Sequence, residues 1–113
     1  MSGWRLVIRH GPRVERQRFD DLNAALAAME RRVSEMRAEG PLGEINALRD
    51  FSPAAQVHAR LELSTGGLVR GREAGVDLMG DGALVPYVGV VRKRRLEPPY
   101  RGSAFDAVRD ALR

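Results

Sequence analysis

The sequence of 113 residues contains no cysteine, which excludes disulfide frameworks, zinc sites built from thiolates and cysteine nucleophiles. Aromatic residues make up only 5% of the chain, so a platform that stacks several nucleic-acid bases on paired aromatic side chains is not favoured. Lysine is almost absent, because Lys93 is the only one among 19 basic residues. The arginines are spread along the chain and become informative only where the fold gathers them.

Long apolar runs are also missing. The longest, residues 83–91, is interrupted by Pro86 and Gly89 and is much shorter than the roughly 20 residues of a membrane-spanning helix. The first residues lack the charged and apolar regions of a signal peptide. We therefore expect a soluble cytoplasmic protein.

What the chain does contain is typical of one globular domain covering residues 1–113. Hydrophobic residues account for 43% and charged residues for 30%, at a length close to the commonest domain size. The net charge of +4 is unevenly distributed. Residues 1–19 carry five arginines against one glutamate, and residues 92–113 carry seven basic residues against three acids. A basic patch is expected only where these two ends meet in space.

Two stretches have the periodicity of amphipathic helices. Asp20 or Asp21 precedes the first as its N-cap, and residues 40–41, Gly-Pro, form a stop signal behind it. Ser103 begins the second, with Asp106 three residues later in an arrangement close to a capping box. The apolar stripes are Leu22, Ala25, Leu26, Met29, Val33 and Met36 in the first helix and Phe105, Val108 and Leu112 in the second.

Five stretches alternate or run apolar in the manner of strands, and turn residues separate them. The order along the chain is β-β-α-β-β-β-α. We predict an α+β fold in which a five-stranded, mainly antiparallel sheet carries two helices on one face. The expected strands cover residues 4–9, 14–19, 57–64, 74–79 and 83–96.

The expected fifth strand is apolar on both faces, whereas helices on one side of the sheet would cover only one of them. The Asp81-Gly82 pair favours a two-residue turn, which would place Leu78 opposite Val85, but a slip of one residue would exchange the faces. Either register leaves an apolar row uncovered, and this predicts a homodimer. The interface residues expected on this basis are Val7, Met79, Leu84, Val85, Val88 and Val90.

A monomer is the alternative. The connector at residues 41–55 contains Leu42, Ile45 and Leu48 at a spacing that allows one apolar face. If this connector folds over the outer face of the sheet, no second chain is needed there. The sequence leaves both arrangements open, as it does the register of the fifth strand.

Catalytic chemistry has little support. His58 and Glu62 share the polar face of the third expected strand and are the only polar pair that suggests a pocket, but no nucleophile with a base and an orienting group can be assembled around them. The chain also lacks a metal-ligand spacing and a phosphate-binding glycine loop. We therefore expect no catalytic residue, no metal and no cofactor.

The densest basic run suggests anion or nucleic-acid binding. On a strand, consecutive residues point to alternate faces, so only half of such a run can meet one ligand. Arginines of the first strand are expected nearby and would add phosphate contacts. The residues of this expected surface are Arg5, Arg9, Arg92, Lys93, Arg94 and Arg95.

These observations rank three functions. The first is a small non-enzymatic binding or assembly module that forms a homodimer and contacts a further protein. The second is a nucleic-acid-binding module that uses its arginine-rich strand ends. The third is a small enzyme or ligand carrier with a pocket between the helices and the sheet. The sequence names no ligand, partner or pathway.

Overall fold

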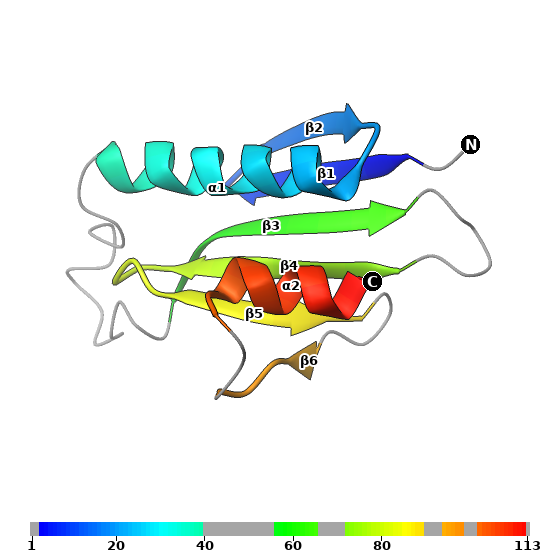
Figure 1. The fold of residues 1–113 in the computed structure, drawn as a ribbon. Helices are drawn as coiled ribbons and strands as arrows, with labels where there is room; N and C mark the ends of the chain where they lie inside the picture. The colour runs from blue at the N-terminus through cyan, green and yellow to red at the C-terminus, as the bar shows by residue number, and fades with distance from the viewer. Residues whose placement is uncertain (1–2, 40–55, 66–71, 90–93, 99–101, 113) are drawn as a thin grey trace.

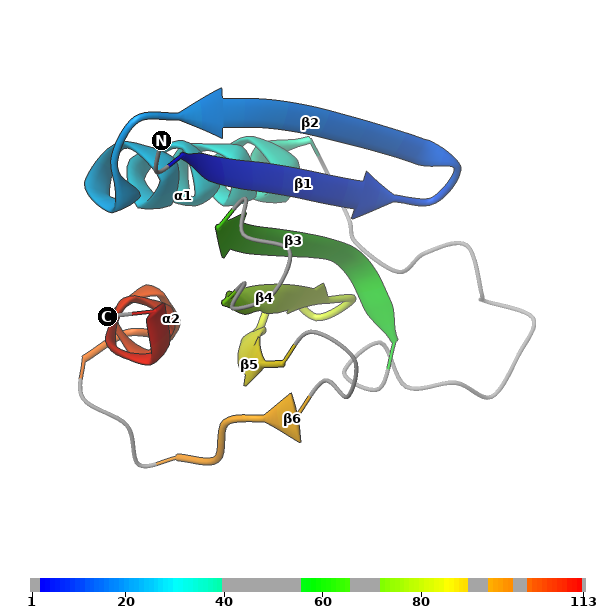
Figure 2. The same ribbon diagram turned by 90° about the vertical axis from the view of Figure 1, so that its right-hand side faces the viewer.

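A computed structural model describes residues 3–39, 56–65, 72–89, 94–98 and 102–112. Six strands form one antiparallel sheet in the order β2-β1-β3-β4-β5-β6, and both helices lie on the same face of it (Figures 1 and 2). The predicted α+β class is confirmed, although the sheet has six strands instead of five. The elements are β1 Trp4–His10, β2 Arg13–Phe19, α1 Leu22–Ala38, β3 Val57–Thr65, β4 Glu73–Met79, β5 Leu84–Val88, β6 Arg94–Arg95 and α2 Ala104–Leu112.

The β1–β2 hairpin forms one edge of the sheet. Gly11 and Pro12 make a two-residue turn, and His10 pairs with Arg13 on either side of it. This turn fixes the register of the whole hairpin, which continues without a break to the pair of Trp4 and Phe19. Because paired residues share a face, the side chains of both strands are sorted by this one turn.

Helix α1 begins at the predicted cap. The Asp21 carboxylate accepts a hydrogen bond from the Ala24 backbone N–H at 2.7 Å. The Nη2 atom of Arg32 lies 2.7 Å from the Oε2 atom of Glu15 on β2, and this ion pair connects the helix to the hairpin. The predicted stop at residues 40–41 lies outside the described residues. The buried positions of α1 are Ala25, Leu26, Ala28, Met29, Val33 and Met36, close to the predicted stripe.

Helix α2 begins with the predicted capping box. The Ser103 hydroxyl accepts from the Asp106 backbone N–H at 3.2 Å, and the Asp106 carboxylate accepts from the Ser103 backbone N–H at 2.9 Å. Figure 2 shows α2 over the same face as α1, beside β4 and β5. The core therefore lies between the two helices and this face of the sheet. Its strand residues are Leu6, Ile8, Ala59, Leu61, Leu63, Ala74, Val76 and Leu78.

The turn between β4 and β5 differs from the expected one. Met79 donates its backbone N–H to the Ala83 carbonyl at 2.8 Å, and Gly82 between them has a φ of 91°. A three-residue loop whose last residue is left-handed adds one residue to the predicted two-residue turn. Leu78 consequently lies opposite Leu84, and the predicted pairing with Val85 is wrong.

This register decides the faces of β5. Leu84 and Val88 pack against the helix-covered core, whereas Val85 lies opposite Asp77 on the outer face. The expected long fifth strand is also divided. β5 ends at Val88, and the following Gly89 has a φ of 120°, which no extended strand adopts. The chain pairs again as β6, where the Leu96 backbone N–H donates to the Pro86 carbonyl at 2.8 Å.

Candidate functional site

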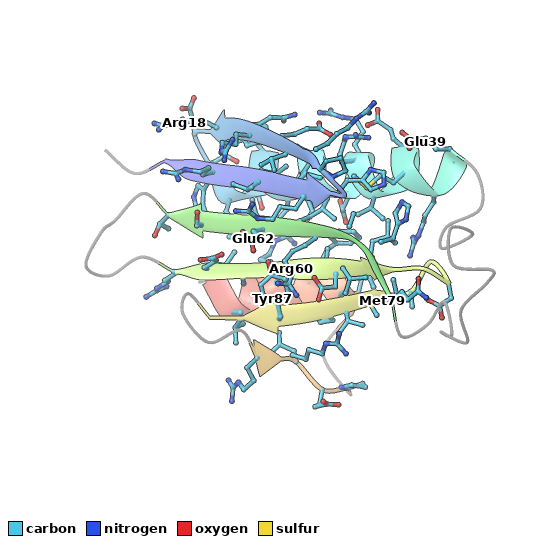
Figure 3. All side chains as sticks on the ribbon, turned by 180° about the vertical axis from the view of Figure 1, so that it is seen from behind. Arg18, Glu39, Arg60, Glu62, Met79 and Tyr87 are labelled. Atoms are coloured by element: carbon cyan, nitrogen blue, oxygen red, sulfur yellow. The ribbon has the colours of Figure 1, made fainter. Side chains whose placement is uncertain are left out.

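The outer face of the sheet, opposite the helices, gathers arginines at the β1–β2 edge (Figure 3). The register puts Arg5 directly opposite Arg18, and it puts Arg16 opposite Val7. Leu6 and Ile8 alternate with Arg5 and Val7 along β1 and point to the core. Arg5 therefore points outward, and so do Arg18 and Arg16, which pair with Arg5 and Val7. Arg9, two residues after Val7 in β1, lies on the same face, and all four arginines are exposed. We call this set the hairpin arginines: Arg5, Arg9, Arg16 and Arg18.

No acid shares this face of the hairpin. The single glutamate of residues 1–19, Glu15, lies opposite the core residue Ile8 and therefore on the helix side. There it accepts hydrogen bonds from Arg32 at 2.7 and 3.3 Å, which lower the pKa of the Glu15 carboxyl. Glu15 is thus paired with Arg32 of α1 on the helix side. The charged side chains on the outer face of the hairpin are all positive.

Three of the hairpin arginines form no ion pair with any residue in the described ranges: Arg5, Arg16 and Arg18. Arg9 has one distant contact, with its Nε 3.9 Å from a carboxylate oxygen of Glu62 on β3. A hollow of about 290 Å³ is lined by Arg5, Arg16, Gln17 and Arg18. Three arginines from both strands of the hairpin therefore border one space.

The middle of the outer face is different, because its acids are buried and its arginine is paired with one of them. Arg60 on β3 binds Asp77 on β4 through two hydrogen bonds of 2.7 and 3.0 Å, and Asp77 is only 1% exposed. This bidentate bond raises the pKa of Arg60. The Arg60 guanidinium carbon also lies 5.1 Å from the centre of the Tyr87 ring. These contacts occupy Arg60 within the protein.

Tyr87 on β5 completes this central cluster. It is 1% exposed and lies opposite Gly75 of β4. Burial strongly raises the pKa of its phenol, and the negative charge of Glu62 adds to the effect. The phenol therefore stays neutral at physiological pH. Figure 3 shows Tyr87, Arg60 and Glu62 over the middle strands, with Arg18 at the far edge on β2.

The expected polar pair of His58 and Glu62 does not come together. They are four positions apart along β3, a distance of about 13 Å along a strand. His58 instead lies at a bulge where its ring centre is 4.4 Å from that of His10. Burial and the neighbouring His10 lower the pKa of His58. The described residues contain no group of three or more metal-ligating side chains that could hold an ion.

The expected anion-binding residues are divided between two places. Arg5 and Arg9 lie on β1, whereas Arg94 and Arg95 lie on β6, and three strands separate β1 from β6. At the usual strand spacing this is about 19 Å, too far for one compact patch. Arg92 and Lys93 lie outside the described residues. The first two arginines instead gain Arg16 and Arg18, which the sequence analysis missed. Residues 11–12 were the available signal, because a two-residue turn there pairs these positions.

The expected dimer residues are likewise divided. Val85 lies on the outer face, and alternation along β1 and β4 places Val7 and Met79 there as well. Leu84 and Val88 face the core instead, and Val90 lies outside the described residues, as does the connector at 41–55. Arg60, Glu62 and Asp77 interleave with the outward apolar residues, so the outer face is mixed rather than a continuous apolar patch.

Neither α1 nor α2, the helices within the described ranges, is long and apolar enough to cross a membrane. Comparison of the chain with known protein families, with curated proteins and with solved structures gave no match.

Proposed function

We propose that the protein is a small non-enzymatic binding module that holds an anionic ligand on the hairpin arginines. The observation that carries this proposal is the direct pairing of Arg5 with Arg18 on one exposed face, with no acid beside them on the hairpin. Like charges opposite each other on neighbouring strands destabilise a sheet. An anion between the two guanidinium groups turns this repulsion into attraction.

The chemistry of the donors favours phosphate. A guanidinium group presents its N–H donors in a planar fork that matches two oxygens of a phosphate or carboxylate. Arg5, Arg16 and Arg18 line one hollow, so residues of two adjacent strands border the space proposed for the anion. Elsewhere on this face Arg60 is already held by Asp77, which leaves the hairpin as the better anion site.

A titration with inorganic tripolyphosphate, followed by calorimetry at low salt, tests the proposal. The Arg16→Gln/Arg18→Gln double variant should bind at least about tenfold more weakly than the wild type, since charged hydrogen bonds are lost. The matched control is Arg94→Gln/Arg95→Gln, which removes the same charge from exposed positions on β6 at the other edge. It should bind within about twofold of the wild type.

Equal losses in the two double variants, or no heat of binding for the wild type, would refute the proposal. Misfolding is a poor explanation for a loss, because Arg16 and Arg18 are exposed and Arg18→Gln removes a like-charge pair. Thermal unfolding of each variant provides the check. A homodimer and a cytoplasmic location stay predictions.

A further inference from the structure

We infer, on the basis of the proposed function, that the ligand is a nucleic acid held by its phosphate backbone along the β1–β2 hairpin. The proposed function requires only an anion. The inference adds the class of anion, its direction across the sheet and the number of phosphates that the protein contacts.

The hairpin arginines are arranged in a line along the two strands. Arg5 and Arg18 occupy one row of the register, Arg16 the next row on this face, and Arg9 the third. Rows on one face are two residues apart, so the three rows extend over about 14 Å. One phosphate is too small to reach all of them. A chain of phosphates running parallel to the strands meets each row in turn.

The acids of the outer face set the direction in which the nucleic acid runs over the sheet. Glu62 and Asp77 lie toward the middle of the sheet, and Asp77 is neutralised by Arg60. Glu62 on β3 lies opposite Val7, and its carboxylate is 3.9 Å from the Nε of Arg9. A polyanion crossing the sheet from β1 toward β4 would therefore approach this carboxylate. One that follows the hairpin keeps to the edge, where the outward charges are all positive.

The phosphates of a nucleic acid are spaced regularly, as the rows of hairpin arginines are. Successive phosphates on one strand of a nucleic-acid duplex are separated by more than their axial rise of about 3.4 Å, because the backbone winds around the axis. The rows of hairpin arginines are about 7 Å apart along the strands, so neighbouring rows can meet neighbouring phosphates. Each row can meet one or two phosphates, and the four hairpin arginines together can make up to about four phosphate contacts. Phosphates carry no sequence information, and we therefore expect binding that does not depend on base sequence.

The test measures binding of a fluorescent mixed-sequence DNA duplex between about 50 and 200 mM salt. For four contacts the logarithm of affinity should fall with the logarithm of salt with a slope of up to about −3.6. Arg16→Gln/Arg18→Gln should reduce the magnitude of this slope by about 1.8, and the matched Arg94→Gln/Arg95→Gln variant should leave it unchanged. An unlabelled duplex of a different sequence should compete equally with the labelled one.

The outcomes separate the inference from the proposed function. If tripolyphosphate binds at the hairpin and the duplex does not, the inference fails and the proposed function remains. If neither binds, both fail. Inorganic polyphosphate that competes better than the duplex at equal phosphate concentration overturns the nucleic acid as ligand. A salt slope that Arg16→Gln/Arg18→Gln leaves unchanged overturns the hairpin as its track.

Discussion

Gly75 and Tyr87 lie opposite each other on the outer face of the sheet, and the missing side chain of Gly75 leaves the space that Tyr87 occupies. A Cβ built on Gly75 would lie 2.7 Å from the Tyr87 hydroxyl oxygen and 2.1 Å from the Leu61 carbonyl oxygen. Tyr87 is thereby buried on a face that no helix covers, and it lies within reach of Arg60. The glycine is part of the packing of this central cluster.

We therefore expect Gly75→Ala to be destabilising. The added methyl group must displace backbone of β3 and the Tyr87 ring, and overpacking of this kind costs about 1–3 kcal/mol. Urea unfolding of the variant measures the loss. Gly3→Ala is the control, because nothing lies within 4 Å of a Cβ at that position. If both alanine variants unfold at the same urea concentration, Tyr87 is not packed against Gly75.

Leu26 tests the position of α1. It is 1% exposed in the core between the helix and the sheet. Leu26→Ala should lower the free energy of unfolding by about 2–5 kcal/mol, because it removes a buried side chain and leaves a cavity. Val14→Ala on β2 is the control, because Val14 is 39% exposed. It should change the free energy of unfolding little. A loss below about 0.5 kcal/mol for Leu26→Ala would mean that this face of the helix does not meet the sheet.

The pair of His10 and His58 predicts how stability depends on pH. Burial and the charge of His10 lower the pKa of His58 below its ordinary value of 6.5, while Glu39 opposes this effect. As the pH falls below about 6.5, the unfolded chain takes up a proton that the folded chain resists, so the contribution of His58 to stability is lost toward acid. The depressed Glu15 carboxyl acts separately, below its ordinary value of 4.5.

Chemical unfolding at about pH 8 and about pH 5.5 measures this contribution. The wild type should be less stable at the lower pH, and His58→Gln should narrow the difference. In an NMR titration, His10→Gln should raise the pKa of His58, because a repelling charge is removed. A wild type and a His58→Gln variant with the same change in stability would rule out His58 as the source.

The homodimer prediction now has a more specific form. Val85 lies on the outer face and is the position where an aspartate should separate two chains, whereas Val88→Asp places a charge against the core and should unfold the protein. Light scattering over micromolar concentrations should give about twice 12.5 kDa for the wild type. A mass near 12.5 kDa throughout would establish the monomer.

The elements that the sequence predicts best are those with a signal inside one short segment. Helix α1 has an apolar stripe and a cap at Asp21, and the β1–β2 hairpin has a two-residue turn at residues 11–12. The cap of α1 is found where expected, and the two strands expected on either side of residues 11–12 pair through this turn. Residues 80–82, Gly-Asp-Gly, allow a turn of two or of three residues. Side-chain periodicity cannot choose between them when β5 is apolar on both faces.

The candidate site shows the same limit at longer range. The sequence identifies Arg5 and Arg9, but it cannot show that three strands separate them from the basic run of β6. Strand order depends on packing between segments that are distant in the chain. Arg16 and Arg18 were accessible in principle, since the hairpin turn sets their partners in β1. The turn at residues 11–12, a local signal, determines which arginines share a face of the hairpin. The strand order of the whole sheet places β6 too far away to join them.

The most direct test of the account is to locate the bound anion by NMR. Titration of ¹⁵N-labelled protein with inorganic tripolyphosphate should shift the backbone and Nε signals of Arg5, Arg16 and Arg18 far more than those of Arg94 and Arg95 on β6. This result places the ligand on the outer face of the β1–β2 hairpin. Shifts that are largest on β6, or equally small over all arginines, would contradict the hairpin as the binding site.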